Sequence, residues 1–191
     1  VWGEIAVLAE RTGQRSVRIS ALVPAGILAT LDGRLAEAVA LGERCTTLGT
    51  ELGLASFSRT RRNVASGGAC LYRGQASEVL AAPTPSVRAL AMAHAGRLAE
   101  TRVLLDALVL QRPGIGAADD EYPAVQDYHL LETAVLSRHR QAAALLLQRL
   151  GDNPSMVSGI YIPCCPARVL GAAAALLGDR ESAKRWYDQV L

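Results

Sequence analysis

The chain has 191 residues, of which half are hydrophobic and only 4% are aromatic. Its 20 Lys and Arg residues nearly balance its 18 Asp and Glu residues, and the formal net charge is +2. This balance excludes the strongly basic surface that is typical of nucleic-acid or anionic-lipid binding. With so few aromatic residues the interior must be filled by Ala, Leu and Val, which favours closely packed helices over strands.

Neither a disulfide framework nor a membrane segment is predicted. The four cysteines are Cys45, Cys70, Cys164 and Cys165. Their number and spacing are typical of a reduced, cytoplasmic protein, and the adjacent Cys164 and Cys165 are interpreted as thiols, with a vicinal disulfide as the alternative. The longest apolar run, residues 169–177, is far shorter than the roughly 20 residues of a membrane-spanning helix. Because the chain begins with Val1 and its last predicted helix reaches Leu191 without a cap, we expect a fragment of a longer multidomain protein.

Five helix pairs are predicted along the chain. Their first helices span residues 16–31, 56–72, 86–95, 124–136 and 167–177. Pro24 lies inside the first of these helices and is expected to kink it near Ala21, because proline has no N–H to donate. The second helix of pair two begins near Gln75 and meets Pro83 and Pro85 within about two turns, so we expect it to be truncated.

Two loops separate the later pairs. Residues 112–122 are rich in Gly, Pro and Asp, and we expect a loop that ends by capping a helix near Pro123. A second predicted loop covers residues 151–166. In the last pair, the first helix ends at a turn on Gly178, and Asp179 is expected to cap the helix that follows.

The five pairs share a turn signature. A small residue at the helix–helix turn is followed, five positions later, by a small or β-branched residue in the second helix. The turn residues are Gly33, Gly74, Gly96, Ser137 and Gly178, and the later residues are Ala38, Val79, Thr101, Ala142 and Ala183. Successive copies lie 41, 22, 41 and 41 residues apart. This period predicts an all-α fold, a right-handed α-solenoid of antiparallel helix pairs that forms a single array over residues 1–191.

Glycines inside the predicted helices indicate close packing. Three of them lie seven residues before a turn glycine, namely Gly26, Gly67 and Gly171. A glycine inside a helix costs about 1 kcal/mol relative to alanine, so we expect a partner helix to pass too close there for a side chain. The last helix has a predicted buried face formed by Ala183, Trp186, Tyr187 and Val190.

The last pair resembles the tetratricopeptide repeat. The residues that match the pattern of this repeat are Gly171, Gly178, Ala183, Tyr187 and Val190. Its closing proline is matched by Pro113 after Thr101 and by Pro154 after Ala142. The period of 41 residues exceeds the usual 34, so the connections between repeats must be longer. The resemblance implies a concave face built from the first helices, on which a protein segment or an adjoining domain binds.

Longer stretches of the chain are similar to a wider family. The segments that carry this similarity are LDGRLAEAVALGERCTTLG, HAGRLAETRVLLDALV, AALLLQRL and CPARVLGAAAALLGDRESAKRWYDQVL. They resemble the carboxy-terminal helical region of large bacterial signalling proteins, in which a nucleoside-triphosphatase module precedes the repeats and a nucleotide cyclase or LuxR-type DNA-binding domain can be attached. The resemblance implies a non-catalytic scaffold for protein interaction or ligand sensing inside an ATPase-linked regulator.

No catalytic, cofactor or metal site is predicted. The only lysine, Lys184, lies in a predicted helix without a following Ser or Thr, so it does not belong to a phosphate-binding loop. Ser66 lies beside glycines but lacks the preceding strand and the G-x-S-x-G spacing of a nucleophile elbow. Potential metal ligands gather at Asp127, His129, Glu132 and His139. No second liganding pair with suitable spacing accompanies them, which favours an ordinary helix face.

Two other functions stay open. One is an enzyme with a pocket between helices that uses Tyr128, His129 and Glu132 as its polar groups. The other is a structural spacer that holds two domains apart. A basic cluster contains Arg59, Arg61, Arg62 and Arg73. We expect it to form a solvated helix face, with contact to an acidic partner or an adjoining domain as the alternative.

Overall fold

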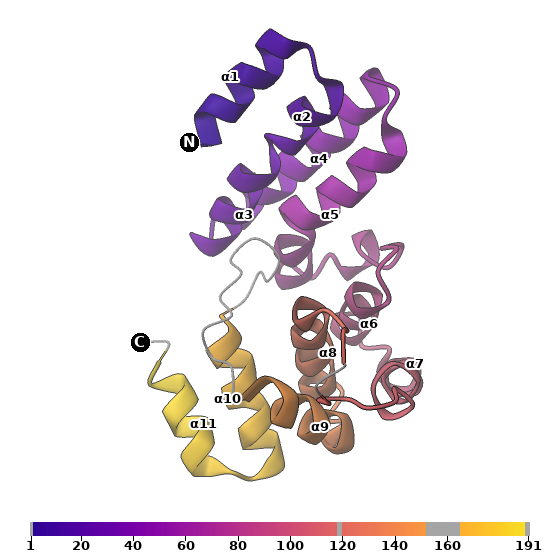
Figure 1. The fold of residues 1–191 in the computed structure, drawn as a ribbon, viewed down its shortest axis with the longest axis vertical. Helices are drawn as coiled ribbons and strands as arrows, with labels where there is room; N and C mark the ends of the chain where they lie inside the picture. The colour runs from indigo at the N-terminus through magenta and orange to yellow at the C-terminus, as the bar shows by residue number, and fades with distance from the viewer. Residues whose placement is uncertain (1, 118–119, 152–164, 190–191) are drawn as a thin grey trace. The chain divides into compact units, whose positions relative to one another are not determined.

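The computed structural model describes residues 2–117, 120–151 and 165–189, and over these residues the chain is helical and contains no strand (Figure 1). The predicted all-α class is therefore confirmed. None of the described helices is both long and apolar enough to cross a bilayer. The described helices belong to two compact units, which divide between Ala82 and Pro83. A single array over residues 1–191 stays a prediction.

Unit 1 is built around one long helical hairpin. Its elements are α1 (Trp2–Thr12), α2 (Arg15–Ser20), α3 (Val23–Leu31), α4 (Leu35–Glu51), α5 (Ala55–Tyr72) and the short 3-10 helix η1 (Ala76–Glu78). Helices α3, α4 and α5 each pack against the other two. Many of the buried side chains between these helices are small, and these include Ala29, Ala38, Cys45, Ala65 and Ala69. Such side chains allow the helices to approach closely.

Prolines shape unit 1 as the sequence predicted. The helix expected over residues 16–31 is broken into α2 and α3 at Ala21 and Leu22, and Pro24 lies in the first turn of α3. The second helix of pair two is reduced to the three residues of η1. Helix α6 then begins at Pro85. Both predicted interruptions are confirmed.

Unit 2 pairs three first helices with three second helices. Its elements are α6 (Pro85–His94), α7 (Leu98–Leu105), the π-helical turn η2 (Asp106–Leu110), α8 (Ala124–Leu136), α9 (Arg140–Gly151), α10 (Pro166–Leu177) and α11 (Arg180–Tyr187). The first helices pack in the order α6, α8 and α10, and α11 lies alongside α10 (Figure 1). Helix α8 is enclosed, since every residue from Asp127 to Ala134 is buried.

The same turn recurs at the ends of the first helices. Gly33, Gly74, Gly96 and Gly178 have φ values of 75°, 75°, 74° and 92°, a left-handed conformation that suits glycine. After each of them the next N–H reaches back to a carbonyl five residues earlier, as from Asp179 to Ala174 at 3.0 Å. The glycine N–H also bonds to a carbonyl three residues earlier, as from Gly178 to Ala175 at 3.1 Å. The two hydrogen bonds together form a Schellman motif, which satisfies carbonyl groups at the helix end. Gly53 forms a further copy between α4 and α5 that the repeat signature did not include.

The fourth copy corrects the predicted register. Ser137 was assigned to the turn, but the left-handed residue is Arg138, with a φ of 54°. The N–H of His139 bonds to the carbonyl of Ala134 at 2.8 Å and completes the same motif. Ser137 instead is buried and donates its hydroxyl proton to the carbonyl of Thr133 at 2.8 Å. The turn therefore lies one residue later than the sequence indicated.

The signature residues in the second helices lie in the core. Ala38, Thr101, Ala142 and Ala183 are all buried, and Val79 is buried beside η1. Asp179 caps α11 as expected, because its carboxylate accepts a hydrogen bond from the N–H of Ser182 at 3.0 Å. The predicted apolar face of that helix is only partly buried. Trp186 is enclosed, Tyr187 is 39% exposed, and Val190 lies outside the described residues.

Close approach explains two of the three helix-interior glycines. A Cβ atom on Gly26 would lie 2.6 Å from the carbonyl oxygen of Ala65, and one on Gly171 would lie 2.8 Å from the Tyr187 ring. Gly67 has no atom within 4 Å of that position, so the expectation of close packing there is wrong. The tightest approaches instead join Gly42 and Gly49 of α4 to Ser66 and Ser58 of α5, and no repeat position predicted these contacts.

Candidate functional site

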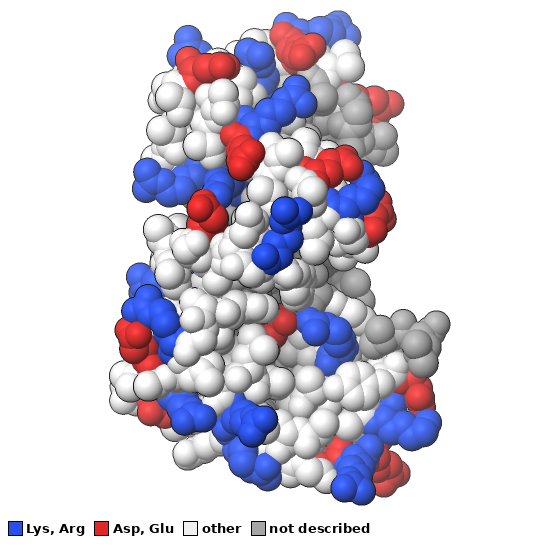
Figure 2. All heavy atoms as spheres, turned by 180° about the vertical axis from the view of Figure 1, so that it is seen from behind, with Lys and Arg blue, Asp and Glu red and all other residues white. Residues whose placement is uncertain are grey.

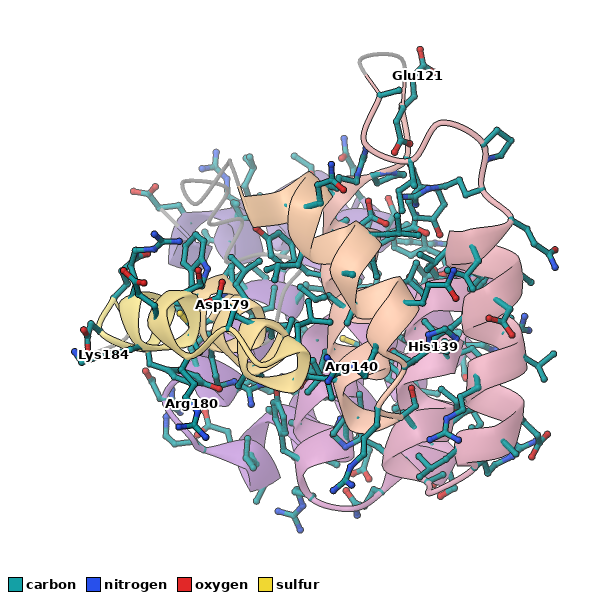
Figure 3. The ribbon with its side chains drawn as sticks, turned by 90° about the horizontal axis from the view of Figure 1, so that it is seen from below. Glu121, His139, Arg140, Asp179, Arg180 and Lys184 are labelled. Atoms are coloured by element: carbon teal, nitrogen blue, oxygen red, sulfur yellow. The ribbon has the colours of Figure 1, made fainter. Side chains whose placement is uncertain are left out.

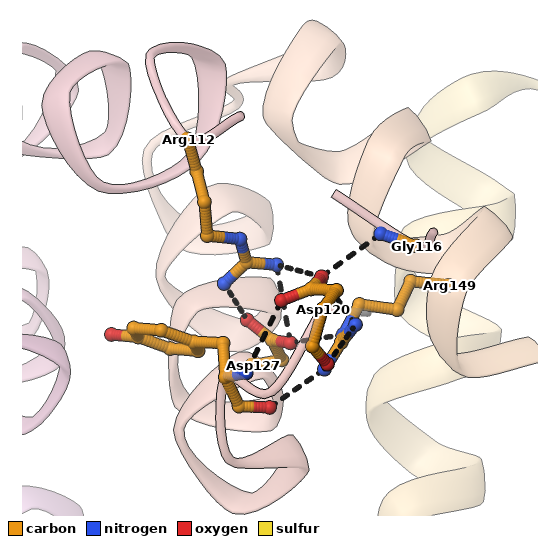
Figure 4. A network of polar contacts seen from close by, with 6 residues as sticks. Arg112, Gly116, Asp120, Asp127 and Arg149 are labelled. Carbon is orange, nitrogen blue, oxygen red and sulfur yellow. Dashed lines mark hydrogen bonds and ion pairs between the residues drawn. The ribbon is translucent and has the colours of Figure 1, made fainter. Parts of the chain in front are cut away.

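A buried ionic network lies in unit 2 (Figure 4). Asp127 of α8 accepts hydrogen bonds from Arg112 at 2.8 Å and from Arg149 of α9 at 2.5 Å. Asp120 of the connecting loop also pairs with Arg149, and it lies 3.5 Å from Arg112. The amides of Gly116 and Tyr122 donate to the Asp120 carboxylate at 2.9 and 3.2 Å. Two arginines therefore neutralise two aspartates inside the unit.

The two carboxylates have different electrostatic environments. Burial alone would raise the pKa of Asp120, but the amides of Gly116 and Tyr122 and the charges of Arg112 and Arg149 outweigh burial and hold that pKa below its usual value. Burial raises the pKa of Asp127, and hydrogen bonds from the same two arginines oppose the rise.

The ionic network holds the loop of residues 112–122 in place and does not form a binding site. The Arg112 guanidinium stacks over the Tyr122 ring at 4.4 Å, and Arg149 donates to the Tyr122 carbonyl at 2.6 Å. These contacts hold both ends of the predicted 112–122 loop against α8 and α9. Glu121, by contrast, lies where the loop projects from the helices (Figure 3). Since its carboxylates and guanidinium groups bind one another, the arrangement is that of a structural clamp.

The residues proposed for an enzyme pocket are enclosed in α8. Tyr128, His129 and Glu132 are all buried, and Glu132 accepts a hydrogen bond from Arg168 of α10 at 2.9 Å. On α6, burial lowers the pKa of His94, and the charge of nearby Glu132 opposes that effect. The ion pair of Arg168 with Glu132 thus joins α10 to α8, and His94 of α6 lies near Glu132. The burial of the α8 side chains favours a role in packing α6, α8 and α10 together.

His139 is separated from these residues by the turn after α8 and caps the next helix. Its Nε2 lies 3.0 Å from an Asp106 oxygen, and its Nδ1 accepts a hydrogen bond from the Ala142 N–H at 3.2 Å. The neighbouring Arg140 donates to the Leu177 carbonyl at the end of α10 (3.0 Å; Figure 3). Among the described residues, no group of His, Cys, Asp and Glu side chains is arranged to hold a metal ion.

The cysteines are divided between core and surface. Cys45 and Cys70 are buried free thiols, whereas Cys165 is an exposed free thiol. Burial raises the pKa of the Cys45 thiol to about 11 and also raises that of Cys70, so both favour the unreactive protonated form. Cys164 lies outside the described residues, as does Pro154.

An open groove lies in unit 1, between α4, α5 and the chain that follows η1. Its volume is about 640 Å³. The lining residues are Glu43, Thr46, Thr47 and Thr50 of α4, Ala55, Arg59, Arg62 and Asn63 of α5, and Glu78, Ala81 and Ala82. The α4 residues recur at spacings of three and four, as do those of α5, so each helix presents one continuous face to the groove.

The groove contains both paired and unpaired charges. Arg62 is already paired, because it donates to the Glu78 carboxylate at 2.8 Å and to the Glu78 carbonyl at 3.1 Å. Arg59 and Glu43 form no hydrogen bond or ion pair with the rest of the described chain. Of the predicted basic cluster, Arg61 stacks on the Phe57 ring at 4.8 Å. Within the part of the chain that the structure describes, the groove therefore presents one guanidinium, of Arg59, and one carboxylate, of Glu43, that form no ion pair.

The groove differs from the predicted binding face. Residues 56–72 were expected to line a concave surface made by first helices, and they supply part of the wall. The opposite wall comes from α4, a second helix, which the sequence analysis did not include. The proline-induced truncation after Gln75 was the available signal, because it leaves this side of the α4–α5 hairpin without a covering helix.

Ser66 takes part in helix packing, not in a nucleophile elbow. It lies in the interior of α5, and its hydroxyl donates to the Arg62 carbonyl at 3.0 Å. Its side chain fills the space beside Gly42 of α4.

On the face shown in Figure 2, acidic and basic side chains are interspersed.

Comparisons of the chain with models of protein families, with curated proteins and with solved structures gave no match.

Proposed function

We propose that the chain is a non-catalytic scaffold that binds a segment of another protein or an adjoining domain, and that the groove of unit 1 is a binding surface. The groove carries this proposal because it combines an open volume of about 640 Å³ with the unpaired charges of Arg59 and Glu43. Recognition surfaces need such polar groups, since an unpaired charge can gain a partner on binding.

We further propose that the helix pairs continue as a right-handed solenoid similar to tetratricopeptide-repeat arrays. The recurrent Schellman turns and the succession α6, α8 and α10 support this proposal. A concave face formed by the first helices is the second proposed surface. Helix α8 would contribute little exposed area to it, because Asp127 to Ala134 are buried.

The proposed setting is a cytoplasmic, ATPase-linked bacterial signalling or transcriptional regulator. Sequence resemblance to the helical regions of such proteins supports this setting. The gene itself provides the test: a glycine-rich loop ending in Lys-Ser or Lys-Thr is expected upstream of the codon for Val1. A full-length gene without any triphosphatase domain would contradict the regulator assignment.

Site-specific photocrosslinking tests the scaffold function. A photoreactive amino acid is placed at Thr47 inside the groove, or at Arg180 on exposed α11 as the control. In cells that make the full-length protein, we expect Thr47 to crosslink to one discrete polypeptide or to an adjoining domain, and Arg180 to give no such product. If a scan of exposed positions yields no protein crosslink, binding is excluded and the structural spacer is favoured.

A further inference from the structure

The groove lies where the second repeat lacks its second helix. In the other pairs, a second helix lies along its first helix, as α4 does along α3 and α11 along α10. In the second pair, η1 begins the same path after Gly74 and ends at Glu78. Glu78 contacts Arg62, which is ten residues before the end of α5 at Tyr72. The chain thus turns back along α5 for a short distance and then leaves it.

The open part of the groove continues this path. Beyond Arg62, its α5 wall runs through Arg59 to Ala55, toward the hairpin turn. Eight residues separate Ala55 from Asn63, which corresponds to about 12 Å of helix, or roughly two turns. The missing part of the second helix would cover this length. The groove therefore has the extent of two helical turns.

The walls suit the close approach of a helix. Apart from the charged groups and Asn63, the lining consists of threonines and alanines, with Thr46, Thr47 and Thr50 on one wall and Ala55, Ala81 and Ala82 on the other sides. Small side chains let helix axes come close, as they do elsewhere in this chain. The same small lining offers few deep apolar pockets, so charge must contribute to recognition.

The two unpaired charges lie at different levels of the groove. The contacts of Gly42 with Ser66 and of Gly49 with Ser58 fix the antiparallel register of α4 and α5. In this register Glu43 is level with residues 64 and 65 of α5, one to two turns from Arg59. A helix that follows the missing second helix, antiparallel to α5, passes Glu43 first and Arg59 afterwards. Such a helix complements the charges of both Glu43 and Arg59 if, on its face toward the groove, a basic residue precedes an acidic residue by about four positions.

We propose that an α-helical segment of the partner protein occupies the groove in place of the missing second helix, antiparallel to α5, with a carboxylate on Arg59 and a basic group near Glu43. This inference rests on the proposed scaffold function and adds the conformation, direction and charge order of the bound segment. The groove then completes its repeat with a helix from another chain.

Peptides of defined helicity test the proposal. Three labelled, alanine-rich 16-residue peptides serve as probes. The first has Lys and Glu at positions i and i+4 on one face, the second has the same residues in exchanged order, and the third repeats the first with a central proline. By fluorescence polarisation, we expect the first peptide to bind at least tenfold more tightly than the second or the third. Equal affinities, or no binding of any peptide at millimolar concentration, would overturn the proposal.

Protein variants locate the bound peptide. Arg59→Glu should weaken binding of the first peptide at least tenfold. The control Arg44→Glu changes the net charge equally at an exposed position of α4 outside the groove, and it should alter the affinity less than twofold. Thr47→Phe, a change at an exposed position, should block the groove and also weaken binding at least tenfold. Circular dichroism verifies that each variant folds. Equal effects of the two charge reversals would contradict binding in the groove.

The same variants separate this inference from the scaffold function. If the partner captured by crosslinking binds the Arg59→Glu protein as well as the unaltered protein, the helix-in-groove inference is wrong and the scaffold function stands. If no exposed position captures any protein, the scaffold function itself fails.

Discussion

Substitutions at the contact between Gly42 of α4 and Ser66 of α5 should change the free energy of unfolding, because the two helices are closely packed there. A Cβ atom on Gly42 would lie 2.0 Å from the Oγ and 2.7 Å from the Cβ of Ser66. Overpacking of this kind costs about 1–3 kcal/mol, and these short contacts place Gly42→Ala near the upper end. Alanine regains about 1 kcal/mol of helix propensity over glycine. We therefore expect a net loss of about 2 kcal/mol in the free energy of unfolding.

The compensating change is Ser66→Gly, which removes both clashing atoms. Alone it should cost about 1 kcal/mol, from lower helix propensity and lost packing in the core. Combined with Gly42→Ala it should be nearly neutral, because the new methyl group enters the space that the serine leaves. The double-mutant cycle should therefore give a favourable coupling of about 2–3 kcal/mol.

Native-state hydrogen exchange of the α4 and α5 amides, together with urea unfolding followed by circular dichroism, provides these free energies. Gly67→Ala is the matched control, since no atom lies within 4 Å of the added Cβ. That variant should gain up to about 1 kcal/mol. Effects of Gly42→Ala and Ser66→Gly that add within about 0.5 kcal/mol would refute direct contact between the two sites.

Four further outcomes are expected from other residues of the chain. Arg149→Met leaves the buried carboxylates with one arginine and should destabilise unit 2 by about 3 kcal/mol in urea unfolding; a change below about 1 kcal/mol would contradict the clamp. Asp179→Ala should lower the urea midpoint of unfolding by loss of the cap, and Asp179→Ser should restore most of that loss; equal losses in the two variants would exclude capping. At pH 8 a thiol reagent should label Cys165 rapidly and Cys45 only after unfolding. Because burial raises the Cys45 pKa from 9.0 to about 11, its contribution to stability is complete below pH 9 and is lost as the pH rises toward 11; Cys45→Ala should lack this loss.

Sequence reasoning succeeded where one residue type is nearly obligatory. A left-handed turn residue is usually glycine and a helix interruption is often proline, so Gly33, Gly178 and Pro24 could be placed without coordinates. The register failed at Arg138, because an arginine with positive φ carries no compositional signal. Similarly, Gly26 and Gly67 look alike in sequence but differ in what faces them.

The polar sites were harder to predict because they depend on distant residues. The ionic network joins Arg112 to Arg149 through two aspartates, whereas the sequence predicted a loop over residues 112–122 that ends by capping a helix, and an ordinary helix face at Asp127. No periodic pattern encodes such a meeting of loop and helices. The groove arises from the truncated second helix, which the prolines indicated, but the pairing that leaves Arg59 without an ion-pair partner among the described residues could only be seen in three dimensions.

The packing of each helix mainly on elements one or two places away has a consequence for how the chain acquires its structure. Helix α3 can dock on α4, and α5 on both, by closing only short loops, so the entropic barrier to each step is small. Helices α3 to α5 are thus suited to form hairpin by hairpin as they emerge from the ribosome, before the helices of unit 2 have been synthesised.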